Sequence, residues 1–325
     1  MSEVGRVEWQ AYAIGMRSRF RGINVREGVL LRGPAGWGEW SPFWEYDAGE
    51  SLPWLRAAHE AAYETWPAAR RTLIPVNCTV PAVSPARAQQ IVADSNGCRT
   101  AKVKVAEPGQ SLAHDLDRVA AVRDALGPAG RVRVDANGAW TVDDAIAAIT
   151  RLDAAAGGLE YIEQPCRGVA DLAAVRRRVD IRIAADESIR RAEDPLRVKA
   201  LDAADIAVLK VQPLGGVVAC LHIAEQIGIP VVVSSALETS VGIAAGIALA
   251  AALPELPYDC GLATVQLLER DVVPQSLLPV DGALPVRRPE PSAELLAAAA
   301  PSDVATRRWT QRLTAVDALR QDQHS

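Results

Sequence analysis

The sequence predicts an α/β fold: a modified TIM barrel of the (β/α)7β type, with an N-terminal α+β capping domain completed by the C-terminal tail. Across residues 75–262, short apolar runs alternate with helical patterns, which gives eight strands and seven intervening helices. The strands are continuously apolar, as in a parallel sheet covered by helices. Charged residues end five successive strands, and a barrel, unlike an open sheet, brings all five ends to one centre.

The cap is predicted over residues 1–74. Strand-like patterns occupy residues 7–14, 26–32 and 36–40, and residues 51–71 have the apolar spacing of a helix. The segment 17–22 between the first two strands is polar and ends in glycine, so we expect a mobile hairpin loop there.

The barrel is predicted over residues 75–262. Its strands are expected at residues 76–80, 100–105, 131–134, 159–162, 181–185, 206–211, 231–234 and 258–260. Its helices are expected to begin near residues 84, 111, 141, 169, 194, 216 and 240, the first with a serine N-cap followed by proline. Prolines then interrupt the pattern. The C-terminal segment, residues 263–325, ends in a helix over 303–320 and is expected to pack back on the cap.

The composition argues against nucleic-acid-binding, secreted and membrane-spanning classes of protein. The net charge is −5 and the basic residues are scattered, which gives no support for nucleic-acid binding. The five cysteines include no Cys-x-x-Cys pair, so buried free thiols are expected. No signal peptide is recognisable, and the most apolar stretch is too short to span a bilayer. We therefore expect a cytoplasmic enzyme that acts on a small molecule, as a monomer or homo-oligomer, without membrane contact.

Three carboxylates follow successive apolar strands: Asp135, Glu163 and Asp186. Carboxylates meeting at one barrel mouth would repel one another, and a hard divalent cation removes that cost. Oxygen ligands with room for water and substrate suit Mg²⁺, with Mn²⁺ as the alternative. The competing interpretation is that each carboxylate merely caps the helix that follows it.

Lysines end the strands on either side of the carboxylates. Lys102 and Lys104 are two residues apart and share one strand face. A partly desolvated lysine beside another cation has a lowered pKa and can act as a general base. Lys210 ends an otherwise apolar strand, where a buried ammonium without function would be costly. Asn137 is expected to orient a carboxylate ligand, and Glu187 to pair with a lysine.

In order along the chain, Lys102-Val-Lys104, Asp135-Ala-Asn137-Gly-Ala-Trp140, Ile162-Glu-Gln-Pro165, Ala185-Asp-Glu-Ser188 and the lone Lys210 closely resemble the motifs of the enolase superfamily, muconate lactonizing enzyme subgroup. The resemblance covers nearly the whole chain, because Gly36-Trp-Gly-Glu-Trp40 also looks like the family's capping domain. It implies Mg²⁺ on the three carboxylates and enolisation of a carboxylate substrate. Ala106 departs from the family pattern, in which a glycine often follows the lysine strand.

Within the subgroup, the chain most resembles the o-succinylbenzoate synthases. The pointers are Arg19-Phe20-Arg21-Gly22 and residues 26–31 in the cap, and Ser234-Ser235 after the seventh strand. The implied reaction is the syn dehydration of 2-succinyl-6-hydroxy-2,4-cyclohexadiene-1-carboxylate in menaquinone biosynthesis. Lys104 is implied as the base and Lys210 as a cation facing the ring. Ser234 and Ser235, with amides of the following helix, would hold the succinyl carboxylate, under a loop of Arg19, Phe20 and Arg21.

Four alternative functions compete with this interpretation: three other enzyme activities on the same fold, and a barrel without catalytic activity. A racemase of N-succinyl amino acids would use Lys104 and Lys210 as bases on opposite faces. Dipeptide epimerases usually carry Asp-x-Asp after the last barrel strand, where this chain has Asp259-Cys-Gly261, and a mandelate racemase-like mechanism needs a histidine where Ser234 stands. A catalytically silent barrel that only binds a ligand is disfavoured by the intact set of lysines and carboxylates.

Overall fold

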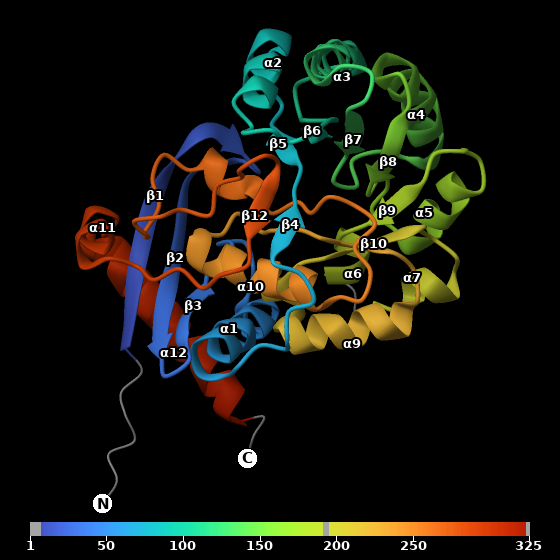
Figure 1. Cartoon of the computed structure of the whole chain (residues 1–325). Helices are drawn as coiled ribbons and strands as arrows, with labels where there is room; N and C mark the ends of the chain where they lie inside the picture. Colours follow the sequence, from blue (N-terminus) through green and yellow to red (C-terminus); the bar gives the residue numbers. More distant parts are fainter. Residues whose placement is uncertain (1–7, 191–194, 323–325) are drawn as a thin grey trace, which may run out of the picture.

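The structure, a computed structural model, describes residues 8–190 and 195–322. Its N-terminal part is a three-stranded antiparallel sheet of β1 (Glu8–Phe20), β2 (Ile23–Gly33) and β3 (Gly36–Trp40), drawn in blue in Figure 1. Residue 7 of the first predicted strand lies outside the described residues. The expected mobile loop over residues 17–22 is wrong, because β1 continues to Phe20. Only Arg21 and Gly22 form the turn, both with positive φ (50° and 76°), as in tight hairpins.

Helix α1 (Ala48–Tyr63) packs against this sheet, but its bounds differ from the predicted 51–71. Asp47 is the N-cap: its side chain accepts a hydrogen bond from the Glu50 backbone, and the Glu50 side chain accepts one in return. This capping box starts the helix earlier than its apolar stripe suggests. The helix ends before Pro67, whose ring disfavours helical geometry in the residue that precedes it.

Seven parallel strands form the barrel sheet, and each pairs with its neighbours in sequence. They are β5 (Cys78–Val80), β6 (Thr100–Lys104), β7 (Arg131–Asp135), β8 (Leu159–Glu163), β9 (Ile183–Ala185), β10 (Ile206–Leu209) and β11 (Val231–Val233). The helices between and after them are α2 (Pro85–Ala93), α3 (Leu112–Leu126), α4 (Val142–Ala156), α5 (Val169–Arg176), α6 (Glu187–Arg190), α7 (Arg197–Ala200), α8 (Val211–Leu214), α9 (Val217–Ile227) and α10 (Ser240–Ala252). The helix start expected near residue 194 lies outside the described residues.

The expected eighth strand is reduced to two bridging residues that close the ring. Cys260 pairs in parallel with Val76, before β5, and Gly261 pairs in parallel with Ser234, after β11. Backbone hydrogen bonds secure both edges, from Asn77 N to Cys260 O (3.0 Å) and from Gly261 N to Val233 O (2.8 Å). The predicted α/β barrel is therefore confirmed, with a shorter last segment than its apolar pattern suggests.

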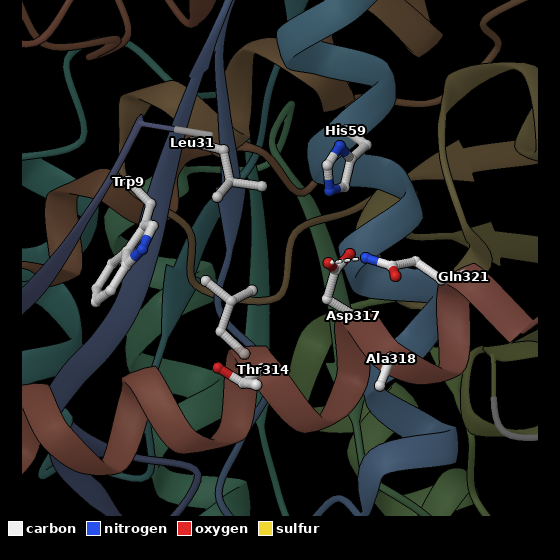
Figure 2. Close-up of a pocket in the computed structure, with 8 residues that line it drawn as sticks. Trp9, Leu31, His59, Thr314, Asp317, Ala318 and Gln321 are labelled. Carbon is white, nitrogen blue, oxygen red and sulfur yellow. Dashed lines mark hydrogen bonds between the residues drawn. The ribbon is translucent and has the colours of Figure 1, made fainter. Parts of the chain in front are cut away.

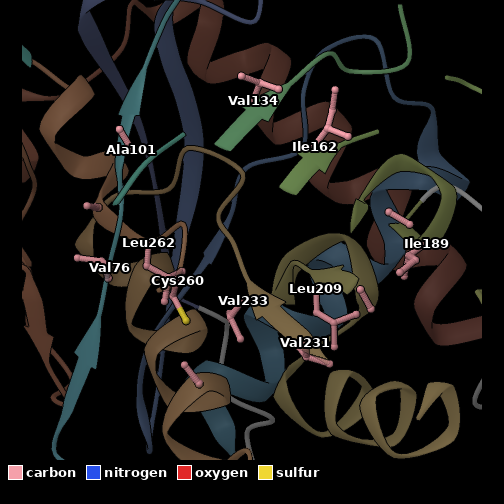
Figure 3. Packing of buried hydrophobic residues seen from close by; sticks show 14 of the residues in the cluster. Val76, Ala101, Val134, Ile162, Ile189, Leu209, Val231, Val233, Cys260 and Leu262 are labelled. Carbon is pink, nitrogen blue, oxygen red and sulfur yellow. The ribbon is translucent and has the colours of Figure 1, made fainter. Parts of the chain in front are cut away.

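The main core lies between the outer face of the barrel and its helices. Figure 3 shows side chains from successive strands, among them Ala101, Val134, Ile162, Leu209 and Val233, in this layer. All five cysteines are buried and free, as predicted. Within the described residues, no helix is both long and apolar enough to cross a lipid bilayer.

The C-terminal segment contributes to the core of the N-terminal part. Its elements are the 3₁₀ helix η1 (Ala263–Leu267), β12 (Ala283–Pro285), which pairs with β4 (Leu73–Pro75), and helices α11 (Ala293–Ala298) and α12 (Asp303–Asp322). On α12, Trp309 is fully buried and meets Trp40 edge to face, with ring centroids 5.5 Å apart. Figure 1 shows α12, in red, beside the blue sheet and α1. The division at residues 74 and 262 stays a prediction.

Candidate active site

The barrel interior carries the predicted site residues at its carboxyl end. A small buried cluster of Tyr161, Ala184, Ile206, Val208 and Val232 lines the interior. Side chains two residues further along each strand lie on the same face, and these are Glu163, Asp186, Lys210 and Ser234. The pleat of short strands therefore explains why one layer of the barrel is polar and the layer below it is mostly apolar.

On β6 to β8, the two lysines bind two of the carboxylates. Lys102 donates to both Glu163 oxygens (2.8 and 2.9 Å) and lies 3.2 Å from Asp135 Oδ2. Lys104 donates to Asp135 Oδ2 at 2.6 Å and to Asn137 Oδ1 at 2.7 Å. Asn137 also donates its backbone N–H to Asp135 Oδ1 (3.0 Å) and so contacts that carboxylate directly.

On β9 and β10, Asp186 binds two cations. Lys210 Nζ lies 2.5 Å from Asp186 Oδ2, and Arg190 Nε lies 2.9 Å from Oδ1. Glu187 does not pair with a lysine as expected. It accepts from Arg190 at 2.5 Å and from Asn137 Nδ2 at 3.2 Å. Arg190 lies three residues after Glu187 on α6, so one helix face places the guanidinium between both carboxylates.

The pKa values of this cluster move in opposite directions. Burial by itself would lower the pKa of Lys102, but the charges of Glu163 and Asp135 raise it above its ordinary range. Burial also opposes ionisation of Asp135, yet the ammonium groups of Lys104 and Lys102 hold its pKa well below the usual value. The expected lowering of a lysine pKa is therefore wrong for Lys102, because two carboxylates contact its ammonium group.

The positive charge near Glu163 does not offset the effect of burial on the pKa of its carboxyl group. Burial raises its pKa to about 7, and the charge of Asp135 adds to this, although both Glu163 oxygens accept hydrogen bonds from Lys102. Those contacts favour the carboxylate form, so the raised pKa means that burial and repulsion outweigh them. A further cation at Glu163 would relieve this repulsion.

The carboxylate oxygens of the cluster are of the kind that a hard divalent cation takes as ligands. Within residues 8–190 and 195–322, no three His, Cys, Asp or Glu side chains form a group with metal-holding geometry. Lysines contact the carboxylates of Asp135, Glu163 and Asp186. In addition, the buried Glu187 Oε2 has no hydrogen-bond partner among the described residues. All these possible metal-ligand atoms are carboxylate oxygens, which Mg²⁺ and Mn²⁺ prefer.

The hairpin residues take different positions. Phe20 lies over the site, with its ring centroid 5.3 Å from Lys104 Nζ. Arg21 turns toward the cap, where it donates to Tyr46 (2.8 Å) and Glu45 (3.0 Å). Arg19 is exposed. Of the three predicted residues, the structure thus brings Phe20 against a site lysine.

Ser234 and Ser235 lie where β11 ends, but the neighbouring backbone amides are occupied. Ser234 N donates to Leu209 O (2.9 Å) and Ser235 N donates to Gly261 O (3.1 Å). At the start of α10, Glu39 of the cap accepts from the amides of Thr239 and Gly242 (both 3.1 Å). The expected carboxylate site on these helix amides is wrong, because a carboxylate of the chain already caps the helix. The serine hydroxyls remain candidates for substrate contact.

Gln164 is a site residue that sequence reasoning missed. Its Oε1 accepts from the backbone of Asp186 (3.0 Å) and of Ser188 (3.1 Å), which ties the end of β8 to the end of β9. Its left-handed φ of 41° resembles those of Asn137 (48°) and Ala106 (58°) at neighbouring strand ends. Such strained residues persist only where their surroundings impose them. Glu-Gln-Pro gave no signal for this conformation, because a following proline favours an extended backbone in the residue before it.

A cavity of about 360 Å³ lies elsewhere, between the cap sheet, α1 and α12. Figure 2 shows Trp9, Leu31, His59 and Asp317 around it. Burial lowers the pKa of His59 to about 4. None of the predicted site residues lines this cavity, so it is separate from the lysine–carboxylate cluster.

Comparisons with known proteins agree with this geometry. Residues 85–291 match the family model described as enolase C-terminal domain-like, and residues 11–62 match the enolase N-terminal domain-like model. An o-succinylbenzoate synthase of Thermobifida fusca is 62% identical over 309 residues, which is 95% of this chain and 96% of the relative. The o-succinylbenzoate synthase of Mycolicibacterium smegmatis is 57% identical over 307 residues, with 94% of each chain covered.

Solved structures show the same fold at low sequence identity. The muconate lactonizing enzyme from Pseudomonas fluorescens, complexed with muconolactone, has a TM-score of 0.77 at 23% identity and covers 90% of this chain and 98% of its own. An N-succinyl Arg/Lys racemase from Bacillus cereus has a TM-score of 0.77 at 20% identity, with 91% and 97% covered. From the domain matches and the close relatives, we conclude that this chain belongs to the enolase superfamily.

Proposed function

We propose that the protein is an o-succinylbenzoate synthase, which converts 2-succinyl-6-hydroxy-2,4-cyclohexadiene-1-carboxylate to 2-succinylbenzoate and water. The observation that carries the choice of this reaction is the sequence identity, 62% and 57%, to relatives of that name over nearly the whole chain; the groups that would act are Lys104 and Lys210. Lys104 ends β6 and Lys210 directly follows β10, the second and sixth segments of an eight-segment ring, so the two lysines lie on opposite sides of the mouth.

Lys104 is the proposed base. In its neutral form it takes the proton α to the substrate carboxylate, and the resulting ammonium returns a proton to the departing hydroxyl. Both transfers occur on one face of the ring, which makes the dehydration syn. Asn137 accepts from Lys104 Nζ at 2.7 Å and holds the amine at the strand end, while the Phe20 ring covers it. Positioning of this kind lets one lysine serve first as base and then as acid.

Lys210 and Lys102 have different proposed roles. Lys210 is a cation on the far side of the ring, where a desolvated cation–π contact contributes about 2 kcal/mol. Lys102 is buried and its raised pKa keeps it protonated. It therefore acts as a fixed positive charge beside Glu163 and Asp135 rather than as a second base.

Members of the enolase superfamily typically use a divalent metal ion, and we propose Mg²⁺ held by Asp135, Glu163 and Asp186. When bound there, such an ion would supply positive charge that stabilises an enediolate form of the substrate carboxylate. Asn137 and Glu187 would support the ligands from behind.

Four carboxylates and four basic side chains meet in this cluster of described residues: Asp135, Glu163, Asp186 and Glu187 with Lys102, Lys104, Lys210 and Arg190. The substrate has two carboxylates, and a bound divalent ion would add a charge of +2 to the site. We propose that the hydroxyls of Ser234 and Ser235 contact the succinyl carboxylate, and that Arg19 and Arg21 lie at the entrance.

The test is a measurement of kcat/KM for two substrates side by side, the diene and an N-succinyl amino acid. Dehydration of the diene is followed as a fall in its ultraviolet absorbance, with Mg²⁺ and with a chelator. We expect turnover that needs the metal. Absence of metal-dependent turnover of the diene by the folded wild-type protein would refute the proposal.

The second candidate function is racemisation of N-succinyl amino acids. It is favoured by the same opposed placement of Lys104 and Lys210, because two bases on opposite faces can exchange an α-proton. Exchange of that proton in D₂O, without dehydration of the diene, would make racemisation the function of this site.

A further inference from the structure

The loop from Ser234 to Thr239, between β11 and α10, contains a strained residue. Leu237 has a φ of 67°, in the left-handed region that side chains disfavour by about 1–2 kcal/mol. Conformations of this kind persist only where neighbouring groups over-determine them. The groups that do so here come from the N-terminal sheet, more than 190 residues earlier in the chain.

Arg26 of β2 binds the carbonyls of this loop. It is 2% exposed, and its guanidinium donates to Leu237 O (Nε, 2.9 Å) and to Ala236 O (Nη2, 3.2 Å). The same group donates to Ser41 Oγ (2.8 Å) and lies 4.5 Å from the centroid of the Phe43 ring. A planar, multiply bonded guanidinium holds both carbonyl groups in one orientation.

Glu39 of β3 binds the other end of the loop. Its carboxylate, 2% exposed, accepts from Thr239 N (3.1 Å), Thr239 Oγ1 (2.5 Å) and Gly242 N (3.1 Å). Tyr12 (2.7 Å) and Ser41 (2.8 Å) donate to its second oxygen. A carboxylate at a helix N-terminus satisfies free amides and interacts favourably with the helix dipole. Glu39 thus adds a cap from another part of the chain to that of Thr239, the N-cap residue, whose side chain accepts from Val241 N (3.3 Å).

We propose that Arg26 and Glu39 are positioning residues for the substrate: together they hold the Ser234–Thr239 loop in its strained conformation and so orient Ser234 and Ser235 at the barrel mouth. The inference rests on the proposed function, because it takes these two serines as substrate contacts. The Gly-Trp-Gly-Glu motif of the cap then has a defined part in substrate binding, through the β11–α10 loop.

The first variant is Glu39→Gln, which keeps the shape of the side chain but removes its charge. One carboxylate oxygen becomes an amide nitrogen, which cannot accept, so the variant loses contacts either to Thr239 and Gly242 or to Tyr12 and Ser41. We expect the amides of the segment 234–242 to exchange at least tenfold faster in D₂O. We also expect KM for the diene to rise about tenfold while kcat stays within threefold, because the lost interaction serves binding.

The matched control is Glu60→Gln. Glu60, on α1, accepts from Val217 N (2.7 Å) and Val218 N (3.2 Å) and so caps α9 from the cap domain in the same manner. Its helix does not follow the serine loop. We expect this variant to have an unchanged KM and unchanged exchange over 234–242.

Thr239→Val replaces Glu39→Gln if the latter does not fold, because it removes one donor and keeps the side-chain volume. Its KM should rise in the same direction, and Thr239→Ser should restore it. Faster exchange with an unchanged KM would mean that the contacts only stabilise the fold, and it would overturn the inference. If the wild type dehydrates the diene and KM is unchanged in both Glu39→Gln and Thr239→Val, the inference is overturned and the proposed function stands. If the folded wild type does not dehydrate the diene, the proposed function is overturned as well.

Discussion

Replacing Lys104 with alanine tests the assignment of the base. Its ammonium makes a 2.6 Å contact with Asp135 and a 2.7 Å contact with Asn137, and its side chain is 16% exposed. Removal of a positioned general base lowers a rate by about 10²–10⁴-fold, which corresponds to about 3–5 kcal/mol in the barrier. We expect kcat for diene dehydration to fall within or beyond that range.

The structure also predicts that Lys104→Ala remains folded. Asp135 keeps the ammonium of Lys102 at 3.2 Å, so the variant does not leave a buried carboxylate without a cation, which would cost about 3–5 kcal/mol. The loss is that of hydrogen bonds to a charged group, about 1–3 kcal/mol. Urea unfolding of the metal-free protein measures this difference.

Two controls separate charge from proton transfer. Lys104→Arg keeps a cation at Asp135 but cannot lose a proton near neutral pH, so it should be as inactive as the alanine variant. Lys102→Arg keeps the proposed fixed charge at Glu163 and should retain more activity than Lys104→Arg. A Lys104→Ala variant with kcat within tenfold of the wild type would refute the base assignment.

Three further predictions concern the fold, its pH dependence and the metal. Trp309→Ala should lower the free energy of unfolding by about 3–5 kcal/mol, because a fully buried indole against Trp40 is lost; an unchanged urea midpoint would show that α12 does not complete the cap core. Burial, aided by the charge of Glu39, raises the pKa of Glu238 to about 7. Because this folded-state value exceeds the unfolded one, its contribution to stability is present below about pH 4.5 and is lost as the pH rises through 7, about 3 kcal/mol in all. Glu238→Gln should remove that part of the pH dependence, and a variant with the wild-type slope would contradict it. Mg²⁺ or Mn²⁺ at 100 times its Kd should add about 2.7 kcal/mol of stability, and Asp186→Asn should weaken Mn²⁺ binding measured by calorimetry; equal Mn²⁺ affinity in the variant would exclude Asp186 as a ligand.

Element boundaries show where local patterns were sufficient. The starts of α2, α4 and α10 agree with expectation within two residues, because Ser84, Thr141 and Thr239 lie at their N-caps. The start of α1 was misplaced, since its capping box precedes the apolar stripe. The two-residue hairpin turn was missed, because β1 continues past an irregularity between Gly15 and Phe20 to the pair Phe20–Ile23, which a linear pattern does not show.

The sequence by itself determined the barrel, the face of each strand and the charged residues at its carboxyl end. These follow from apolar periodicity and from the rule that parallel strands end at one mouth. Only the tertiary structure decided which charges meet: Arg190 rather than a lysine on Glu187, and Glu39 rather than substrate on the amides of α10. The physical reason is that a hydrogen bond requires two groups within about 3 Å. Contacts between residues 39 and 239 depend on closure of the whole ring and on docking of the cap, which spacing along the chain does not encode.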